Sequence, residues 1–389
     1  MASLPRNVLA ILAVTMAYRV ATSMGPLAIL VTLADKLSLA VASFALTGWT
    51  FAGALSQPLW IAIVKNIGWR PTFLLLGIVS FASHVGIGIV SGPLSAVLVS
   101  TIAGASLPPI TAQARALLAG LLDADRRSVA FDAEAALASS AFVIAPLVVA
   151  ASNFVGQLGP TISCAALLGL VSLTFAHVGH GIERKSEHPD EGPRRGNTNL
   201  NWLTQALIFS GAAAYGMLAC IEVAVVARID DRTVAALLLT AWAGASLVGG
   251  LMLSRFRDIE RIRLLLLPVP SVASIAMAGL VTSNLPLFSI ILVMSGLAVA
   301  PTIAFLTSEV SRVTQPSQHA KAYGWLQAAS WLGSAIATAV AGSLADISLA
   351  LLLLLASSLA VASFSLIYLC RWLAPARAPL TFSDDYGKP

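Results

Sequence analysis

The sequence repeats itself at an offset of about half its length, and both copies consist of long apolar segments. Leu46-Thr47-Gly48-Trp49 recurs as Leu239-Thr240-Ala241-Trp242, an offset of 193 in a chain of 389 residues. Farther along, Pro109 recurs as Pro301 at an offset of 192. Such a repeat predicts two matched sets of helices related by internal symmetry.

The composition places these helices in a lipid bilayer. The chain is 58% hydrophobic and 11% charged, with a mean hydropathy of +0.87, whereas a soluble domain carries roughly 25% charged residues. Soluble and nucleic-acid-binding proteins are therefore excluded, and the basic residues are scattered over short loops. The three cysteines and five histidines show no metal-binding or CxxC spacing, so we expect no metal and no cofactor. Two matched halves of membrane helices are typical of transporters that rock around a central site.

Charged or Pro/Gly-rich breaks divide the chain into twelve segments long enough to span a bilayer, which requires about 20 mostly apolar residues. The expected spans are 8–33, 39–64, 71–91, 94–119, 129–151 and 157–178, then 201–227, 233–253, 264–282, 285–309, 320–343 and 347–372. The first apolar run, which begins like a signal peptide, continues to Leu33 and is therefore interpreted as a retained span. The fold class is an all-α polytopic membrane protein.

Basic residues set the orientation. Of the 23 Lys and Arg residues, 19 fall on one side of the twelve spans, whereas Lys36, Arg228 and Arg232 fall on the other and Arg19 lies inside a span. The positive-inside rule then places both ends of the chain in the cytoplasm. We expect a six-helix bundle over 1–178, a polar linker over 179–200, a second bundle over 201–373 and a tail over 374–389.

This arrangement resembles the major facilitator superfamily over nearly the whole chain. The loop 58–70 keeps Gly68 and Arg70 of that superfamily's Gly/Asp/Arg motif, but Lys65 stands where the motif has Asp. That exchange reverses a charge in the superfamily's cytoplasmic latch between the halves. The resemblance implies two six-helix bundles, transport by alternating access, and a central cavity lined by the first and seventh spans.

A bacterial subgroup of efflux permeases is more similar still. The similar stretches are Leu107 to Arg115, Ala130 to Glu134, Phe142 to Pro146, Glu222 to Ala227, and Ala300-Pro301-Thr302 with Ala322 to Trp325. Pro146 is also what remains of a Gly/Pro motif of drug/proton antiporters. Export is what this resemblance implies.

Arg19 and Glu222 are the main site candidates, because an ionisable group at bilayer depth costs several kcal/mol and is usually functional or paired. Arg19 lies about eleven residues into the first span, beside Tyr18, and either anchors an anionic substrate group or forms a structural ion pair. Glu222 lies late in the seventh span and either exchanges protons or only pairs with Arg19 or Arg228. Gln57, Tyr215, Gln327 and Trp331 are further cavity candidates.

A cytoplasmic gate is the second expected site. Asp132 and Glu134 begin the fifth span near Arg115 at the end of the fourth, and either form a latch that opens or a static pair. Glu309 and Arg312, at i,i+3 spacing on one helix face, are the corresponding pair of the second half and are interpreted as structural. Lys65 and Arg70 complete the gate candidates.

The leading hypothesis is a secondary active transporter of the bacterial inner membrane that exports a small organic compound in exchange for protons. The alternatives are proton-coupled uptake of a small anionic nutrient, and a membrane receptor or accessory protein that keeps the fold without transport. GxxxxGK[ST] is absent, which excludes a self-contained ATP-driven pump, and we do not expect an enzyme. The expected partners are the substrate, protons and lipid, with no nucleic acid, and we expect a monomer.

Overall fold

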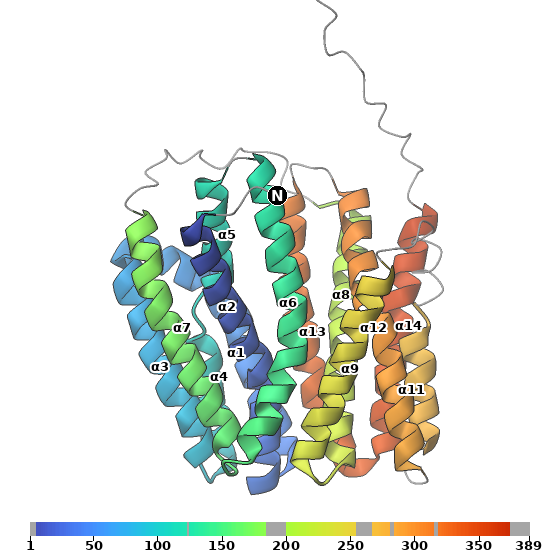
Figure 1. Ribbon diagram of the computed structural model, residues 1–389. Helices are drawn as coiled ribbons and strands as arrows, with labels where there is room; N and C mark the ends of the chain where they lie inside the picture. Colours follow the sequence, from blue (N-terminus) through green and yellow to red (C-terminus); the bar gives the residue numbers. More distant parts are fainter. Residues whose placement is uncertain are drawn as a thin grey trace, which may run out of the picture.

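The computed structural model describes residues 5–122, 124–183, 200–253, 267–280, 284–314 and 318–373, and its regular structure over these residues is helical (Figure 1). The first half of the chain forms α1 (Arg6–Lys36), α2 (Leu39–Ile67), α3 (Trp69–Ile89), α4 (Pro93–Ala105), α5 (Ile110–Leu121), α6 (Ala124–Asn153) and α7 (Gly159–Glu183). The second half forms α8 (Trp202–Arg228), α9 (Arg232–Leu253), α11 (Val269–Leu280), α12 (Leu285–Val313), α13 (His319–Ile347) and α14 (Leu349–Leu373).

Several helices begin at residues that satisfy their first backbone donors. Ser38, Asn201 and Asn284 each accept a hydrogen bond from the backbone N–H three residues later, at the starts of α2, α8 and α12. Gly68 joins α2 to α3 with a φ of 99°, a left-handed conformation that costs little only for glycine. The backbone geometry of the turn between α2 and α3 is therefore enough to explain the glycine at position 68 of the 58–70 motif.

Most of the expected spans correspond to single helices. Among the described residues, ten helical stretches are long and apolar enough to cross a membrane, and Ser140–Asn153 and Val269–Gly279 are shorter apolar helices. The exact number of twelve spans and the cytoplasmic placement of both ends stay predictions. The helix α7 continues to Glu183, five residues into the expected linker, and most of that linker lies outside the described residues.

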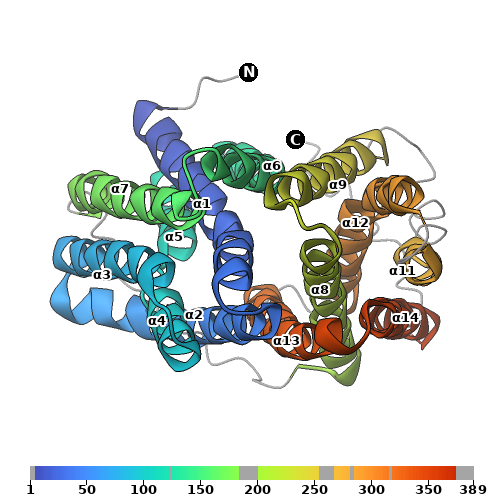
Figure 2. The ribbon, with the colours of Figure 1, turned by 90° about the horizontal axis from the view of Figure 1, so that it is seen from below.

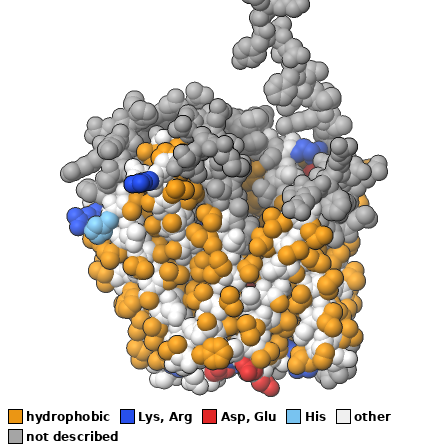
Figure 3. Space-filling model, viewed as in Figure 1, with side chains coloured by type: hydrophobic (Ala, Val, Ile, Leu, Met, Phe, Trp, Pro, Cys, Tyr) orange, Lys and Arg blue, Asp and Glu red, His pale blue; other side chains and the backbone are white. Residues whose placement is uncertain are grey.

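The outer flank of the molecule is apolar. Large side chains such as those of Ile78, Leu94, Phe209 and Met294 are more than half exposed, and Figure 3 shows hydrophobic side chains over the flank with charged groups near its two ends. Soluble proteins rarely expose apolar patches larger than a few hundred Å². The chain is therefore a multi-pass membrane protein.

The internal repeat is visible in the packing of equivalent helices. In the first half, a Cβ on Gly104 would lie 1.9 Å from the carbonyl oxygen of Trp49, so α4 crosses α2 in direct backbone contact. In the second half, a Cβ on Gly296 would lie 2.3 Å from the carbonyl oxygen of Trp242, where α12 crosses α9. Trp49 and Trp242 are the tryptophans of the sequence repeat, so the repeated motif encodes a repeated helix crossing.

The two halves meet along two pairs of helices that the repeat makes equivalent. The helix α2 packs on α13, and α6 packs on α9; α1 and α8 lie between these pairs (Figure 2). On the first pair, Thr47 Oγ1 donates to the Ala335 carbonyl at 3.0 Å. Ser43 lies so close to Gly342 that a Cβ there would come within 2.2 Å of the Ser43 Cβ.

The repeated prolines act differently in the two halves. The sequence predicts symmetric kinks at Pro109 and Pro301, but the expected span 94–119 is instead broken into α4 and α5 around Ser106–Pro109. The helix α12 runs unbroken through Pro301. Two consecutive prolines remove two backbone donors and force Leu107 and Pro108 out of helical geometry, whereas a single proline removes only one donor.

Replacing Gly104 or Gly296 by Ala should destabilise the protein, because the added methyl group collides with a backbone carbonyl that cannot move aside. Overpacking of this kind costs roughly 1–3 kcal/mol. Gly244→Ala is the matched control, since nothing lies within 4 Å of a Cβ there. Thermal unfolding midpoints in detergent should fall for the first two variants and not for the third; equal midpoints for all three would contradict the crossing geometry.

Candidate functional site

Arg19 lies on a face of α1 that other helices leave partly uncovered. Most of α1 from Val8 to Leu33 is buried, but Met16, Arg19, Ser23 and Pro26 are half-buried and recur at the spacing of one helix face. The helices α2, α6 and α7 pack around α1. Arg19 is therefore partly enclosed by neighbouring helices within an expected membrane span.

Side chains from both halves surround Arg19. Its guanidinium acts electrostatically on the hydroxyl of Tyr18 beside it and on that of Tyr215 in α8. The side chain of Gln57 in α2 lies next to the Tyr18 hydroxyl, within hydrogen-bonding reach. The structure thus brings together Arg19, Tyr18, Gln57 and Tyr215, four of the seven predicted cavity residues; we call these four the central polar cluster.

Glu222 lies near this cluster but farther along α8. Tyr215 and Glu222 are seven residues apart, which places them on one helix face about 10 Å apart along the axis. Glu222 is half-buried. The ion pairs that the structure describes do not include Glu222, and its role stays a prediction.

Trp331 and Gln327 lie on one face of α13. The Trp331 ring stacks on Trp49 of α2 with a centroid distance of 6.4 Å and an interplanar angle of 15°, so it bridges the two halves. Gln327, one turn away, is exposed.

Trp49 also contacts His84 of α3 and donates from Nε1 to His84 Nε2 at 3.2 Å. His84 is buried, and its Nδ1 lies 2.7 Å from the Ser80 carbonyl oxygen. His84 is therefore a core residue with satisfied nitrogens.

An ion pair joins the halves at the end of the bundle that carries the α1–α2 connection, which we call the outer end. Arg232 Nε donates to Asp35 Oδ1 at 2.7 Å, linking α9 to the end of α1. Arg232 Nη1 also donates to the carbonyls of Val226 and Ile229 at 2.6 and 3.2 Å, so it caps the end of α8. Sequence analysis did not identify this pair, although Asp35 and Arg232 are opposite charges at the outer ends of two expected spans.

The ion pair lies in a polar cavity. This cavity, of about 160 Å³, is lined by residues of both halves, among them Thr32, Asp35, Asn153 and Arg232. Thr32 Oγ1 and Asn153 Nδ2 are buried without a hydrogen-bond partner in the described part of the chain. Buried polar atoms beside a space of this size are typical of hydrated sites, so the Asp35–Arg232 pair is solvated rather than dry.

The predicted cytoplasmic gate is only partly described. Arg70 and Arg115 are exposed, while the side chains of Lys65, Asp132 and Glu134 lie outside what the structure describes. A latch between Arg115 and the α6 carboxylates therefore stays a prediction.

Glu309 and Arg312 form a pair with a further partner that sequence reasoning missed. Glu309 is 1% exposed, and its carboxylate accepts from Arg312 at 2.7 Å and from Arg371 of α14 at 3.0 Å. Arg371 also lies 5.5 Å from the centroid of the Phe305 ring. The cluster fastens α12 to α14 within the second half.

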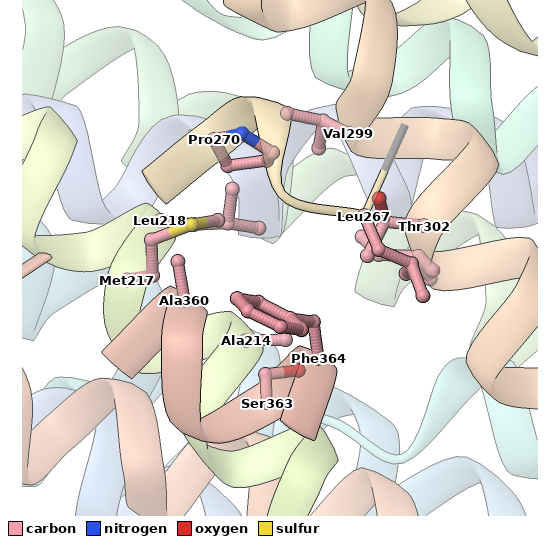
Figure 4. Close-up of a pocket in the computed structure, with 11 residues that line it drawn as sticks. Ala214, Met217, Leu218, Leu267, Pro270, Val299, Thr302, Ala360, Ser363 and Phe364 are labelled. Atoms are coloured by element: carbon pink, nitrogen blue, oxygen red, sulfur yellow. The ribbon is translucent and has the colours of Figure 1, made fainter. Parts of the chain in front are cut away.

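A separate apolar cavity lies within the second half and is not part of the central site. Figure 4 shows its lining, which includes Met217 of α8, Pro270 of α11, Thr302 of α12 and Phe364 of α14. Its volume of about 20 Å³ accommodates roughly one water molecule. We regard it as a packing gap because it is too small for a substrate.

Removing either charge of the Asp35–Arg232 pair should loosen the outer end, since an exposed pair contributes about 0.2–1 kcal/mol and is screened by salt. Spin labels at the exposed residues Val155 and Ile347, in opposite halves, would report this as a longer inter-label distance in Asp35→Asn and Arg232→Gln. Asp346→Asn, at an exposed site on α13, is the control. An unchanged distance distribution in both variants would show that the pair does not hold the halves together.

Replacing Glu309 by Gln should destabilise the second half strongly, because two guanidinium groups share this buried carboxylate. Breaking a buried ion pair from one side costs roughly 3–5 kcal/mol. Arg312→Gln should cost less, since Arg312 is 30% exposed in its side chain and gains water. The thermal unfolding midpoint should therefore fall more for Glu309→Gln than for Arg312→Gln, and the reverse order would contradict this account.

Comparison with solved structures identifies transporters of the same fold. The nucleoside transporter NupG superposes with a TM-score of 0.70 at 15% sequence identity, covering 94% of this chain and 99% of that one. A bacterial homologue of the human lysosomal transporter Spinster, in an inward-facing and occupied conformation, gives a TM-score of 0.67 at 14% identity over 94% and 96% of the two chains. The sequence matches no protein-family model and no curated protein. The chain therefore has the fold of these transporters.

Proposed function

We propose that this chain is a secondary active transporter of the bacterial inner membrane, which exports a small organic compound in exchange for protons by alternating access. The fold shared with known transporters supports transport, and the resemblance to efflux permeases in stretches such as Phe142 to Pro146 supports export. The energy source is the proton gradient, and the protein works as a monomer without metal or cofactor.

The central polar cluster is the observation that carries this proposal. Arg19, Tyr18 and Gln57 come from the first half and Tyr215 from the second, so a solute bound among them contacts both halves at once. Polar groups at bilayer depth are costly and persist where they bind a solute or an ion. A site at the junction of two repeats is also where transporters of this architecture bind their substrates.

Alternating access is supported by where the halves touch. Along α2 and α13, Ser43 contacts Gly342 and Thr47 contacts Ala335 between the middle of the helices and the outer end, and Trp49 stacks on Trp331 near the middle of α13. The Asp35–Arg232 pair adds a contact at that same end. In alternating access, the central site is closed to the outer side in one of the two states, and contacts between the halves at the outer end support such a state.

Glu222 is the proposed proton site. It is the carboxylate on the Tyr215 face of α8, and it is half-buried within a span. A carboxylate in that position can take up and release a proton as its access to water changes. Proton binding there alters the charge about two helix turns along α8 from Tyr215, on which Arg19 acts electrostatically, and this couples the proton to the substrate.

Replacing Glu222 by Gln tests this assignment. The purified protein is placed in liposomes with an internal pH dye, and drugs, sugars and carboxylates are added in turn. We expect substrate-dependent proton movement with the native chain and at least a tenfold loss with Glu222→Gln, because the amide cannot bind a proton reversibly. Asp346→Asn makes the same chemical change at an exposed outer position and should transport normally. Full pH dependence in Glu222→Gln would remove Glu222 from the mechanism.

Uptake of a small anionic nutrient is the second candidate, and the positive charge of Arg19 within the cluster favours it. Transport assays in cells distinguish uptake from export. Accumulation of labelled carboxylates or phosphates by whole cells, lost in Arg19→Gln, would support uptake, whereas faster loss of drugs from preloaded cells would support export.

A further inference from the structure

The break between α4 and α5 leaves a set of backbone carbonyls that need donors inside the membrane. Pro108 and Pro109 have no N–H, so the carbonyls of Gly104 and Ala105 lose their usual helical donors. In lipid, each unsatisfied backbone group costs several kcal/mol. The structure supplies a donor to every carbonyl from Gly104 to Leu107, and three of these four donors are side chains.

The side chains come from α2 and α3. Trp60 Nε1 donates to the Ala105 carbonyl at 2.6 Å, and Gln57 Nε2 donates to the Leu107 carbonyl at 3.0 Å. Ser80 Oγ of α3 donates to the Ser106 carbonyl at 3.4 Å, while the N–H of Leu107 donates to Gly104. Gln57 and Trp60 lie three residues apart on one face of α2. Together they cap the broken end of α4.

The second half has no such cap at the equivalent place. At the repeat offset of 193, Gln57 and Trp60 correspond to Gly250 and Leu253, which have no side-chain donor. There Pro301 lies in a continuous helix, and Ser246 Oγ accepts the N–H of Ala300 at 3.0 Å. The break and its cap are therefore a feature of the first half, and the repeat alone does not require them.

The two pieces of the broken helix pack against different neighbours. The helix α4 packs against α2 and α3, whereas α5 packs against α1, α6 and α7. The four residues Ser106–Pro109 between them form few of the backbone hydrogen bonds that stiffen a helix. A connection of this kind is where a membrane helix bends most easily.

We propose that Ser106–Pro109 is a hinge and that Gln57 is the positioning residue that couples this hinge to the central polar cluster. Gln57 donates to the Leu107 carbonyl in the break, and its side chain lies next to the Tyr18 hydroxyl of the cluster, within hydrogen-bonding reach. A solute that takes over the Tyr18 hydroxyl leaves Gln57 with one partner fewer and changes how the break is held. The inference rests on the proposed transport function for its purpose, and on the contacts of Gln57, Trp60 and Ser80 with the break for its geometry.

Hydrogen exchange of the full-length protein in nanodiscs, without any solute, tests the hinge directly. The amides of Leu107, Ile110 and Gln113 are bonded within or just after the break, so peptides covering Ser106 to Gln113 report on it. Losing one hydrogen bond shifts a local opening by roughly 0.5–1.5 kcal/mol. We expect Gln57→Leu to accelerate exchange in that segment about two- to tenfold, and Trp60→Phe to act in the same direction.

Controls separate the hinge from general loosening. Gln327→Leu makes the same change on α13 of the other half and should leave the segment unchanged, and peptides around Pro301 should not respond to Gln57→Leu. Tyr18→Phe should accelerate exchange at the break, because it removes the second partner of Gln57. Unchanged exchange in both Gln57→Leu and Trp60→Phe would overturn the hinge, and an effect of Gln57→Leu without any effect of Tyr18→Phe would overturn the coupling.

Transport assays distinguish failure of this inference from failure of the proposed function. With a solute identified in liposomes, Gln57→Leu should change the maximal rate more than the KM, because the residue acts on the hinge. If the native chain moves solutes but Gln57→Leu leaves both the exchange and the maximal rate unaltered, the coupling is wrong and transport stands. If the native chain moves no solute, the proposed function fails, and the coupling fails with it.

Discussion

The lack of water in the bilayer core dictates most of this structure, because every backbone donor and acceptor must find a partner within the protein. Helices satisfy that requirement locally, and so the described regular structure is helical. Where Pro108 and Pro109 interrupt a helix, side chains of α2 and α3 supply the missing donors. Gln57 is one of these capping side chains and also lies next to Tyr18. A donor that the interrupted backbone requires is therefore also a member of the central polar cluster.

The spans could be predicted from sequence because their signal is local. The predicted 39–64 and 201–227 became α2 (Leu39–Ile67) and α8 (Trp202–Arg228), since an apolar run must be about as long as the bilayer is thick and charges mark its ends. The repeat also identified an equivalent helix crossing at Trp49 and Trp242. The interrupted span escaped prediction because prolines such as Pro108 and Pro109 are compatible with a kinked continuous helix as well as with a break.

The candidate site was predictable in its residue types but not in its contacts. Arg19 and Glu222 stand out because charge is rare in apolar segments, but the sequence left their partners open and could not place Tyr215 of α8 near Arg19. Pairs such as Asp35 with Arg232, which are 197 residues apart, depend on how α1 and α9 meet. That relation follows from the packing of whole helices.

The unequal prolines give the two halves different stiffness. A continuous helix such as α12 resists bending through its ladder of backbone hydrogen bonds, whereas the α4–α5 connection lacks part of that ladder. Strain along this pair of equivalent helices is therefore taken up more easily at the α4–α5 connection than in α12. Two helices that the repeat makes equivalent thus differ in compliance, although they occupy corresponding places in the two halves.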